Sequence, residues 1–400
     1  MSTSHYDVVT VGGGLGGAAL AMAMAKAGAR VLILERETKF KDRVRGEFLA
    51  PWGVAEAQQL GVADLFRQSG HNVPFMEMGL GRPRDLPSTT PQGVPAMGVS
   101  HPEMQELLLQ AAASAGAHVR REAVVTAVET GELPRVQVHQ SGGSLETVTA
   151  RLVVAADGRN SAVRKWARFS VTRDPHPFFF AGVLLTGLAA PHDVGYYCFN
   201  PAVAMAAASI YEGADRFRAY LAYPSEGVDR LQGEQALPRF LDYSRRTTAF
   251  PTVYDGDLHP IGPLASFPCD EDWVEHPYQD GVALIGDAAA TTDPVYGQGL
   301  SLALRDVHTL SERLLSNTRW DTAGNEYASE HRRYFSAIHT SCSWLRQIFQ
   351  EQGAEADQRR AIALSLIASD PTRIPDHIMS GPELPIDDNV RSRFFGAAES

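Results

Sequence analysis

A glycine-rich turn between an apolar run and a helical stretch constrains this chain more than any other part of its sequence. Gly12, Gly14 and Gly17 are spaced as G-x-G-x-x-G, directly after the β-branched run 7–11 and at the start of the Ala- and Met-rich stretch 18–27. A continuous apolar run of this kind is typical of a strand that is buried on both faces of a parallel sheet. The turn therefore predicts the first βαβ unit of an α/β fold.

The same turn predicts a dinucleotide site. Glycine allows the backbone to approach a pyrophosphate closely, and the phosphates then lie at the N-terminus of the following helix. Glu35 ends the next apolar run, 31–35, 18 residues beyond Gly17. Its carboxylate can accept hydrogen bonds from the hydroxyls of an adenosine ribose. The turn alone does not distinguish FAD from NAD.

Two further turns also follow apolar runs. Asp157-Gly158 comes after the run 148–155, and Gly286-Asp287 comes after the run 282–285. An aspartate that leaves a buried strand at the carboxyl edge of a parallel sheet lies where ligands bind. Each dipeptide alone is more typical of an ordinary turn. Together with the glycine-rich turn they indicate one shared site.

These motifs together resemble those of a known family, the FAD-dependent aromatic hydroxylases related to p-hydroxybenzoate hydroxylase. The three turns occur in the family's order, and a fourth match, 293–300, is the loop that the family places against the isoalloxazine ring. The resemblance covers roughly residues 5–315. It implies an α/β fold with a Rossmann-type FAD-binding domain, an inserted antiparallel-sheet substrate domain and C-terminal helices.

The strand pattern predicts where the second domain is inserted. Four strand-like runs joined by short turns lie between residues 178 and 223, which predicts an antiparallel sheet. We expect the FAD-binding domain to comprise residues 1–75, 99–175 and 276–318, the substrate domain residues 76–98 and 176–275, and the C-terminal helices residues 319–400.

The resemblance implies a role for each matched residue. Gly12, Gly14 and Gly17 would hold the FAD pyrophosphate, Glu35 would hold the adenosine ribose with Arg36 beside it, and Asp287 would bind the ribityl chain. The other implied contacts are Arg45 at the phosphates or ring, Val125 at the adenine, Asp157 in a network between FAD and NAD(P)H, and Gly286, Pro294, Gly297, Gln298, Gly299 and Leu300 near the ribityl chain and ring.

The expected position of the loop 293–300 at the flavin ring also has a physical reason that does not depend on the resemblance. A helix that starts at Gly299 directs its free N–H groups and positive dipole at whatever precedes it, which suits an anionic reduced flavin. One position departs from the family. Many members carry an FAD-binding arginine where this chain has Ser100-His101-Pro102, which leaves open whether His101 takes over that role.

We expect the substrate-contacting residues to lie on the inserted sheet. The candidates are its polar residues, Tyr196, Tyr211, Tyr220, Arg216 and Arg218. Alternation along a strand does not tell which face points at the flavin, and ordinary packing or surface exposure is the alternative for each. His259 and His276 are more typical of surface histidines, and no general base can be named. Pro294 is the residue expected at the flavin face.

The family reaction is the function that the resemblance implies. NAD(P)H reduces FAD, O₂ adds to give a flavin C4a-hydroperoxide, and its distal OH passes to a small electron-rich aromatic substrate in a site that excludes water. Two alternatives are a flavin-dependent reductase or dehydrogenase of the geranylgeranyl-reductase type and a non-catalytic, dinucleotide-binding redox sensor. The tryptophan signature of flavin halogenases is absent, which argues against halogenation.

Composition limits the partners. The chain has 47 acidic and 36 basic residues and a net charge of −11, which disfavours nucleic acid and anionic membranes. Its three scattered cysteines show no disulfide or metal spacing. The N-terminus lacks a signal-peptide pattern, and the longest apolar stretch, 178–190, is shorter than the about 20 residues that span a bilayer. We expect a cytoplasmic monomer or homodimer with no metal, nucleic-acid or membrane partner.

Overall fold

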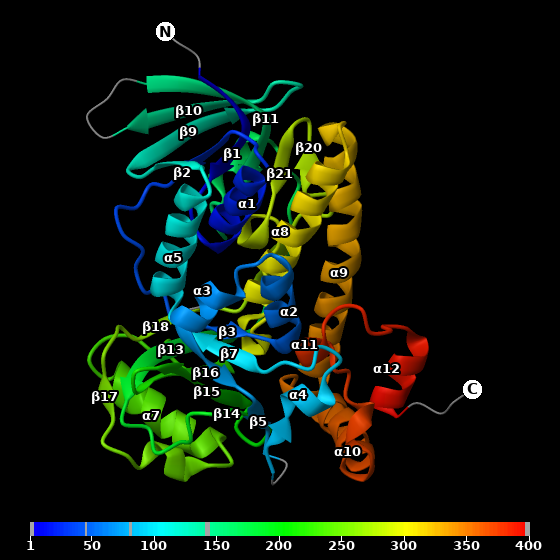
Figure 1. Cartoon of the computed structure of the whole chain (residues 1–400). Helices are drawn as coiled ribbons and strands as arrows, with labels where there is room; N and C mark the ends of the chain where they lie inside the picture. The colour runs from blue at the N-terminus through cyan, green and yellow to red at the C-terminus, as the bar shows by residue number, and fades with distance from the viewer. Residues whose placement is uncertain (1–3, 45, 80–81, 141–144, 397–400) are drawn as a thin grey trace.

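The computed structural model describes residues 4–44, 46–79, 82–140 and 145–396. Two large sheets lie at opposite ends of the molecule, and helices run between them (Figure 1). The mixture of a parallel and a largely antiparallel sheet confirms the predicted α/β class.

The first sheet has the strand order β20-β21-β11-β1-β2-β8. Adjacent members of the series β21, β11, β1, β2 and β8 run parallel, so that their carboxyl ends share one edge. Their bounds are β1 (Ser4–Val11), β2 (Val31–Leu34), β8 (His118–Arg120), β11 (Leu145–Ala155) and β21 (Val282–Leu284), with antiparallel β20 (Tyr278–Gln279), β9 (Ala123–Glu129) and β10 (Arg135–Gln140) added at the margins.

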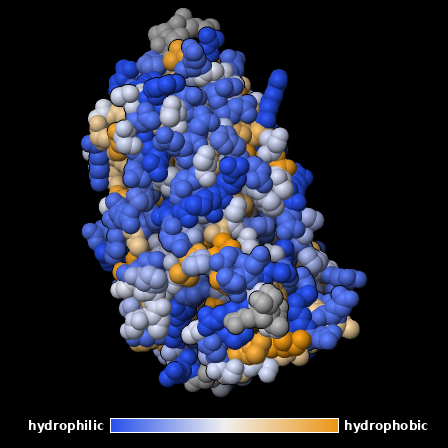
Figure 2. Space-filling model, turned by 90° about the vertical axis from the view of Figure 1, so that its right-hand side faces the viewer, coloured by the Kyte–Doolittle hydropathy of each residue, from blue (hydrophilic) through white to orange (hydrophobic). Residues whose placement is uncertain are grey.

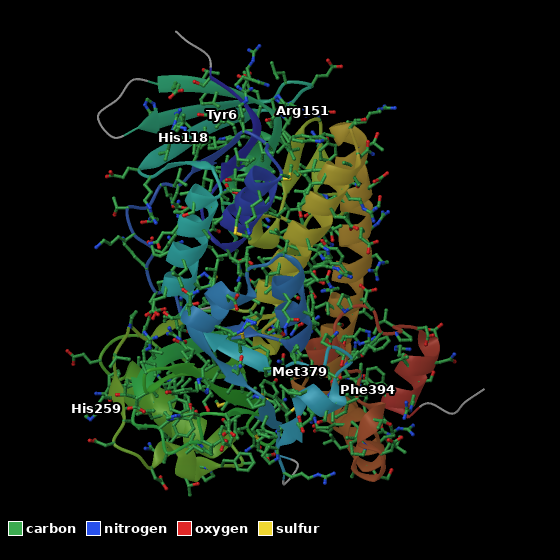
Figure 3. All side chains as sticks on the ribbon, viewed as in Figure 1. Tyr6, His118, Arg151, His259, Met379 and Phe394 are labelled. Carbon is green, nitrogen blue, oxygen red and sulfur yellow. The ribbon has the colours of Figure 1, made fainter. Side chains whose placement is uncertain are left out.

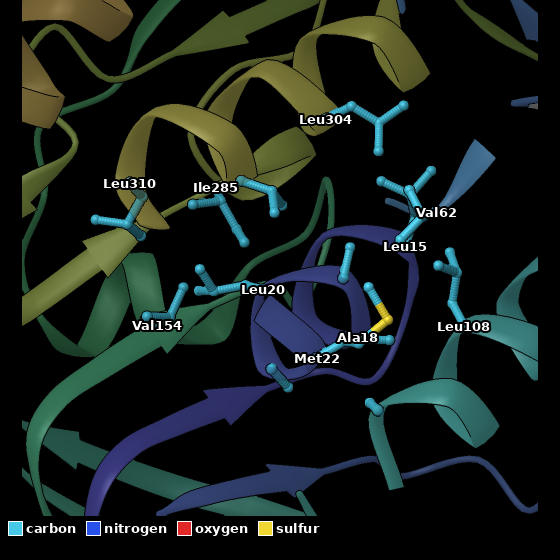
Figure 4. Close-up of a cluster of buried hydrophobic side chains, with 14 of the residues drawn as sticks. Leu15, Ala18, Leu20, Met22, Val62, Leu108, Val154, Ile285, Leu304 and Leu310 are labelled. Atoms are coloured by element: carbon cyan, nitrogen blue, oxygen red, sulfur yellow. The ribbon is translucent and has the colours of Figure 1, made fainter. Parts of the chain in front are cut away.

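Three helices pack on one face of this sheet. α1 (Leu15–Lys26) lies between α5 (His101–Ser114) and α8 (Gly299–Ser316). Figure 4 shows Leu20 of α1 facing Ile285, Val154 and Leu310 in the core beneath these helices. α1 begins three residues before the predicted start, because the glycines of the turn carry no side chain that would keep the first helical turn away from β1.

One predicted strand is in fact two. The strand-like run 118–128 predicts one strand, but the chain is divided into β8 and β9 at Glu122, whose φ of 56° turns it. β8 continues the parallel sheet beside β2, whereas β9 pairs with β10. The charged residues Arg120, Arg121 and Glu122 lie at this turn, but they carry none of the glycine, proline or asparagine signals that mark most turns.

The second sheet has the strand order β17-β13-β16-β15-β14-β5-β6, and its central four strands are antiparallel as predicted. α7 (Ala236–Thr247) packs against β14, β15 and β16. The strands are β5 (Phe75–Glu77), β6 (Arg84–Asp85), β13 (Phe178–Thr186), β14 (Val194–Asn200), β15 (Met205–Gly213), β16 (Arg216–Pro224) and β17 (His259–Pro260), and β18 (Ala265–Pro268) pairs with β13.

The segment expected to leave the FAD-binding domain, 76–98, divides between two sheets. β5 and β6 extend the second sheet, whereas β7 (Ala96–Val99) forms a small sheet with β3 (Phe48–Leu49) and β4 (Gly70–Val73). No pattern in the sequence predicted this small sheet. The domain boundaries themselves stay predictions.

The remaining elements connect or cover the two sheets. α9 runs along most of the molecule, with about 45 Å of helix for its 30 residues, and α10 and α12 lie near its end (Figure 1). The elements are α2 (Pro51–Gln59), α3 (Ala63–Gln68), α4 (Leu86–Thr89), α6 (Ala162–Trp166), α9 (Trp320–Phe349), α10 (Ala354–Ser369), α11 (His377–Ser380), α12 (Asp388–Phe395), β12 (Thr172–Asp174), β19 (Glu271–Trp273) and the 3₁₀ turns η1 (Pro251–Tyr254), η2 (Gly286–Ala288), η3 (Pro294–Tyr296) and η4 (Pro371–Arg373).

The surface is largely polar. Figure 2 shows one face covered mainly by hydrophilic residues, with hydrophobic groups gathered in small areas. Within the described ranges, no helix combines the length and the apolar character needed to cross a membrane. All three cysteines are buried and unpaired.

Candidate active site

A cavity of about 1630 Å³ is bounded by the carboxyl edge of the first sheet, one face of the second sheet and the C-terminal helices. Typical small-ligand pockets measure roughly 300–1,000 Å³. The cavity is therefore large enough for a dinucleotide together with a second molecule.

The glycine-rich turn forms one end of the cavity. Gly12 has a φ of 102°, and a Cβ there would lie 2.3 Å from the carbonyl oxygen of Ala156. A Cβ on Gly17 would lie 2.0 Å from the carbonyl oxygen of Gly12. Gly12 and Gly14 line the cavity, whereas Gly17 does not. Gly17 thus allows α1 to pack on β1, and Gly14 places the uncapped N-terminus of α1 at the cavity.

The predicted adenosine contacts lie beside this turn. Glu35 is buried, and its two carboxylate oxygens accept backbone N–H groups of Gly13 at 2.7 Å and Glu37 at 2.8 Å. Each oxygen retains a lone pair for a further donor. Arg36 and Val125 also line the cavity.

The Asp-Gly and Gly-Asp turns follow β11 and β21 at the same edge. Asp157 uses Oδ2 to accept the N–H groups of Ala162 and Val163 at 2.8 and 3.2 Å, at the start of α6. Its buried Oδ1 has no hydrogen-bond partner among the described residues, and Asp157 lines the cavity. A buried oxygen without a partner at this position can accept a hydrogen bond from a bound ligand.

Asp287 is half-buried and lines the cavity. The Gly-Asp turn is fixed by a hydrogen bond to α8, because the N–H of Gly286 donates to Oδ2 of the buried Asp306 at 2.6 Å. Asp306 also accepts hydrogen bonds from His331 and Tyr334 of α9. α9 therefore supports the Gly-Asp turn through α8.

The loop 293–300 closes the cavity between the two sheets. Gly297 has a φ of 63°, and a Cβ there would lie 2.9 Å from Phe48. Buried Gln298 accepts a hydrogen bond from Trp52 Nε1 at 3.1 Å and donates to the carbonyl oxygen of Tyr296 at 2.7 Å, so its amide fixes the loop. The residues of this loop that line the cavity are Pro294, Val295, Tyr296, Gly297, Gln298, Gly299 and Leu300.

His101 and Arg45 complete the predicted cofactor contacts. His101 lines the cavity at the start of α5, and its Nδ1 lies 2.6 Å from the carbonyl oxygen of Gly46. Because a carbonyl only accepts hydrogen bonds, Nδ1 carries the proton. Arg45 lies outside the described residues.

The second sheet supplies an aromatic wall. Tyr220 and Tyr197 both pair with Ala208, so the three side chains share the face that lines the cavity. Phe180 stacks on Tyr220 with ring centroids 4.8 Å apart. The hydroxyl of Tyr220 donates to Oε2 of Glu47, which is also buried at the cavity.

Two predicted substrate contacts need correction. Tyr211 is buried on the opposite face of the second sheet, where its ring stacks on His192 at 3.9 Å, and it does not line the cavity. Tyr196 borders the cavity, but its register with Ser209 places it on that opposite face, where it packs against Phe250. A strand changes face with every residue, so Tyr197, the neighbour of Tyr196 on β14, lies on the face that lines the cavity.

Neither of the two arginines expected to contact the substrate, Arg216 and Arg218, lines the cavity. Arg216 pairs with Glu103 at 2.8 Å. Arg218 is buried between Asp42 at 2.8 Å and Glu212 at 3.2 Å. Burial raises the pKa of Glu212 to about 7 despite this arginine.

Both predicted surface histidines are exposed. His259 pairs with Asp257 and lies at the outer margin of the molecule (Figure 3), and His276 contacts Asn325.

The C-terminal wall of the cavity carries no motif and was missed. Leu345 and Phe349 of α9 and Ile374 beyond α10 line it, as does Met379, which lies toward the middle of the molecule in Figure 3. Arg84 of β6 holds this wall in place through paired hydrogen bonds of 2.6 and 2.9 Å to Asp376.

Asp293 begins the loop 293–300, named the flavin loop below, and is 1% exposed. Burial and the neighbouring Glu271 raise the pKa of this carboxyl to about 8. An unfolded aspartate has a pKa of about 3.9, so this group stabilises the folded state most at low pH and loses that contribution as the pH rises through about 8.

We expect Asp293→Asn to melt above the wild type at alkaline pH, because the amide can still cap η3 and never ionises. As the pH falls to about 4, the carboxyl is protonated in the unfolded state as well as in the folded state, and the advantage of the variant should disappear. Melting temperatures measured across this range test the prediction, which parallel pH curves for the two proteins would contradict.

The geometry agrees with comparisons to known proteins. The sequence profile of the family described as FAD binding domain matches residues 5–337. The chain belongs to this family. Among curated relatives, 6-methylpretetramide 4-monooxygenase of Streptomyces rimosus is 31% identical over 328 residues, covering 76% of this chain and 73% of that protein. Rifampicin monooxygenase of Streptomyces venezuelae is 25% identical over 370 residues, covering 88% and 74%.

Solved structures show the same fold. p-Nitrophenol 4-monooxygenase of Pseudomonas putida superposes with a TM-score of 0.78 at 18% identity, covering 94% of this chain and 98% of that one. Anhydrotetracycline hydroxylase of Streptomyces rimosus gives 0.73 at 23% identity, covering 96% and 77%. The protein is an FAD-dependent monooxygenase, and its cavity fits FAD through the close-packed glycine turn and the unpartnered Asp157 oxygen.

Proposed function

We propose that this monooxygenase uses NAD(P)H to hydroxylate an electron-rich aromatic molecule, which binds between the flavin loop and the aromatic wall of the second sheet. The observation that carries the proposal is the continuity of the cavity, which runs from the glycine-rich turn to Tyr220 and Phe180. Relatives named for oxidising 6-methylpretetramide and rifampicin support an aromatic substrate.

The residues that would hold FAD follow the cavity. Gly12, Gly14 and Glu35 would hold the pyrophosphate and adenosine, Asp287 would hold the ribityl chain, and the loop from Pro294 to Leu300 would lie against the ring. Bound FAD supplies the redox chemistry that activates dioxygen. The apolar wall of the second sheet excludes water from that reaction.

The Tyr220–Glu47 pair is the polar group of this wall best placed to act on a substrate hydroxyl. A phenol has a pKa near about 10 and is a poor nucleophile until it loses its proton. The tyrosine hydroxyl can accept that proton while it passes its own to the Glu47 carboxylate. We therefore place the pair at the reacting end of the substrate.

Purified protein tests the function directly. We expect bound FAD, and NAD(P)H oxidation that increases with an accepted phenol, aniline or quinolone and consumes one O₂ per hydroxylated product. NAD(P)H oxidation without O₂ consumption would favour the reductase of the geranylgeranyl type. Bound FAD with no turnover under any condition would favour the redox sensor.

Tyr220→Phe should lower kcat/KM about 100-fold on a phenol, because it removes the hydroxyl that would relay the proton. It should also change the pH dependence of the rate, while the variant retains FAD. Steady-state kinetics over a range of pH provide the measurement.

Tyr211→Phe is the matched control. It removes a hydroxyl from the opposite face of the same sheet, where Oη accepts the N–H of Asp215 at 3.3 Å. Its kinetics should equal those of the wild type. Equal loss of activity in both variants would assign the effect to packing of the sheet and remove Tyr220 from the reaction.

A further inference from the structure

A buried polar pair lies directly behind the flavin loop. Asp293 caps η3 by accepting the N–H of Val295 on Oδ1 at 3.0 Å, and its own N–H donates to Glu271 at 2.7 Å. Its second oxygen, Oδ2, faces Nε2 of His176 at 3.5 Å. Both side chains are only 1% exposed.

The two facing atoms are otherwise unused. Neither Oδ2 of Asp293 nor a ring nitrogen of His176 makes a hydrogen bond of ordinary geometry within the described residues. Gln350 lies beside the imidazole, and Phe178 packs against its ring at a centroid distance of 5.3 Å. Polar atoms that are buried without a hydrogen bond are uncommon in native structures, and each one calls for a physical explanation.

The charges around the pair are unbalanced. Arg346 of α9 lies 2.9 Å from Asp174 and 3.7 Å from Glu271, and His339 lies 3.3 Å from Glu271. One arginine therefore faces two carboxylates in addition to Asp293. The other titratable groups that influence the pair are Asp270, Tyr197, Tyr296, Cys269 and Cys342.

This environment keeps both members of the pair neutral near neutral pH. Burial raises the pKa of Asp293 to about 8, and burial with Arg346 lowers the pKa of His176 to about 4. Either group gains a proton more readily when negative charge appears nearby. Asp293 directly precedes Pro294, so the pair lies immediately behind the residue expected at the flavin face.

We propose that Asp293 and His176 form a buried proton-uptake site, which takes one proton from solvent when the bound flavin becomes negatively charged on reduction. The proton binds Nε2 of His176 while Asp293 stays protonated, or binds Asp293 when the carboxyl is ionised at alkaline pH. The inference rests on the proposed position of the flavin ring against the loop from Pro294 to Leu300.

Counting protons tests the inference without NAD(P)H or substrate. The FAD-loaded protein is reduced electrochemically in weak buffer, and proton uptake per flavin is read with an indicator dye. Relative to the wild type, His176→Gln should take up fewer protons below about pH 7, and Asp293→Asn should take up fewer above about pH 8. Uptake equal to that of the wild type in both variants would overturn the proposal.

His377→Gln is the matched control. His377 is another buried histidine, its pKa is also lowered by burial, and its Nε2 lies 3.2 Å from the carbonyl oxygen of Leu384. It does not line the cavity, and its variant should take up protons as the wild type does. An equal decrease in this control would likewise overturn the assignment.

The wild type provides a second measurement that needs no folded variant. The imidazole pKa values of isotope-labelled histidines are measured by NMR in oxidised and reduced holoenzyme. The histidine with the lowest pKa in the oxidised state should titrate at a higher pH after reduction, and an unchanged value would refute the proposal. Because reduction at an electrode requires neither NAD(P)H nor an aromatic molecule, failure of the proposed hydroxylation leaves this result intact.

Discussion

Asp287→Ala is expected to fold normally and to lose FAD during purification. Asp287 lines the cavity, and its carboxylate makes no hydrogen bond with any described residue, so the fold does not depend on it. A charged hydrogen bond contributes about 1.5–3 kcal/mol, and its removal should weaken FAD binding about 10- to 100-fold. Flavin content and FAD titration of the apoprotein provide the measurement.

Asp287→Asn is the matched variant, since an amide oxygen still accepts a hydroxyl but carries no charge. It should bind FAD with an affinity between those of the alanine variant and the wild type. Circular dichroism and the melting temperature of the apoproteins should not differ among the three. Stoichiometric FAD in the purified alanine variant would refute the role of the Gly-Asp turn.

Gly12→Ala is expected to destabilise the protein by about 2–5 kcal/mol and to abolish FAD binding. Its Cβ would lie 2.3 Å from the carbonyl oxygen of Ala156, which belongs to the backbone and has no alternative rotamer. The φ of 102° adds strain for any residue with a side chain. Chemical denaturation of the apoprotein measures the first effect, and flavin content measures the second.

Gly28→Ala separates strain from steric overlap. Gly28 has a similar φ of 90°, but a Cβ there meets no atom within 4 Å. This variant should lose only about 1–2 kcal/mol and retain FAD. If the two variants are equally stable, close packing at the glycine-rich turn does not explain why glycine is required there.

The cofactor half of the site could be predicted because its signals are local in sequence. The glycine spacing, Asp157 and Asp287 each follow an apolar strand, and the parallel sheet brings such strand ends together. Gly17 was assigned to the pyrophosphate, but it is required where α1 packs against the turn. Spacing alone does not separate these two uses of a glycine.

The substrate half could not be predicted to the same degree. The identity of the correct tyrosine depends on which face of the second sheet meets the flavin loop, and that face is set by packing against α7. Tyr220 lies at the cavity as expected, and Tyr196 borders it from the opposite face of the sheet, whereas Tyr197, on the same face as Tyr220, was not among the expected residues. The wall beyond residue 345 has only ordinary helical periodicity, so no pattern connects it to a site formed hundreds of residues earlier.

The bond between Arg84 and Asp376 also has a consequence for how the protein matures. During synthesis the chain emerges N-terminus first, and domains fold in that order. The glycine-rich turn and the Gly-Asp turn are complete before Asp376 leaves the ribosome, so the cofactor cradle can form while one side of the cavity is still open. The segment around Asp376 therefore completes the cavity wall only after the residues that line the rest of it have been synthesised.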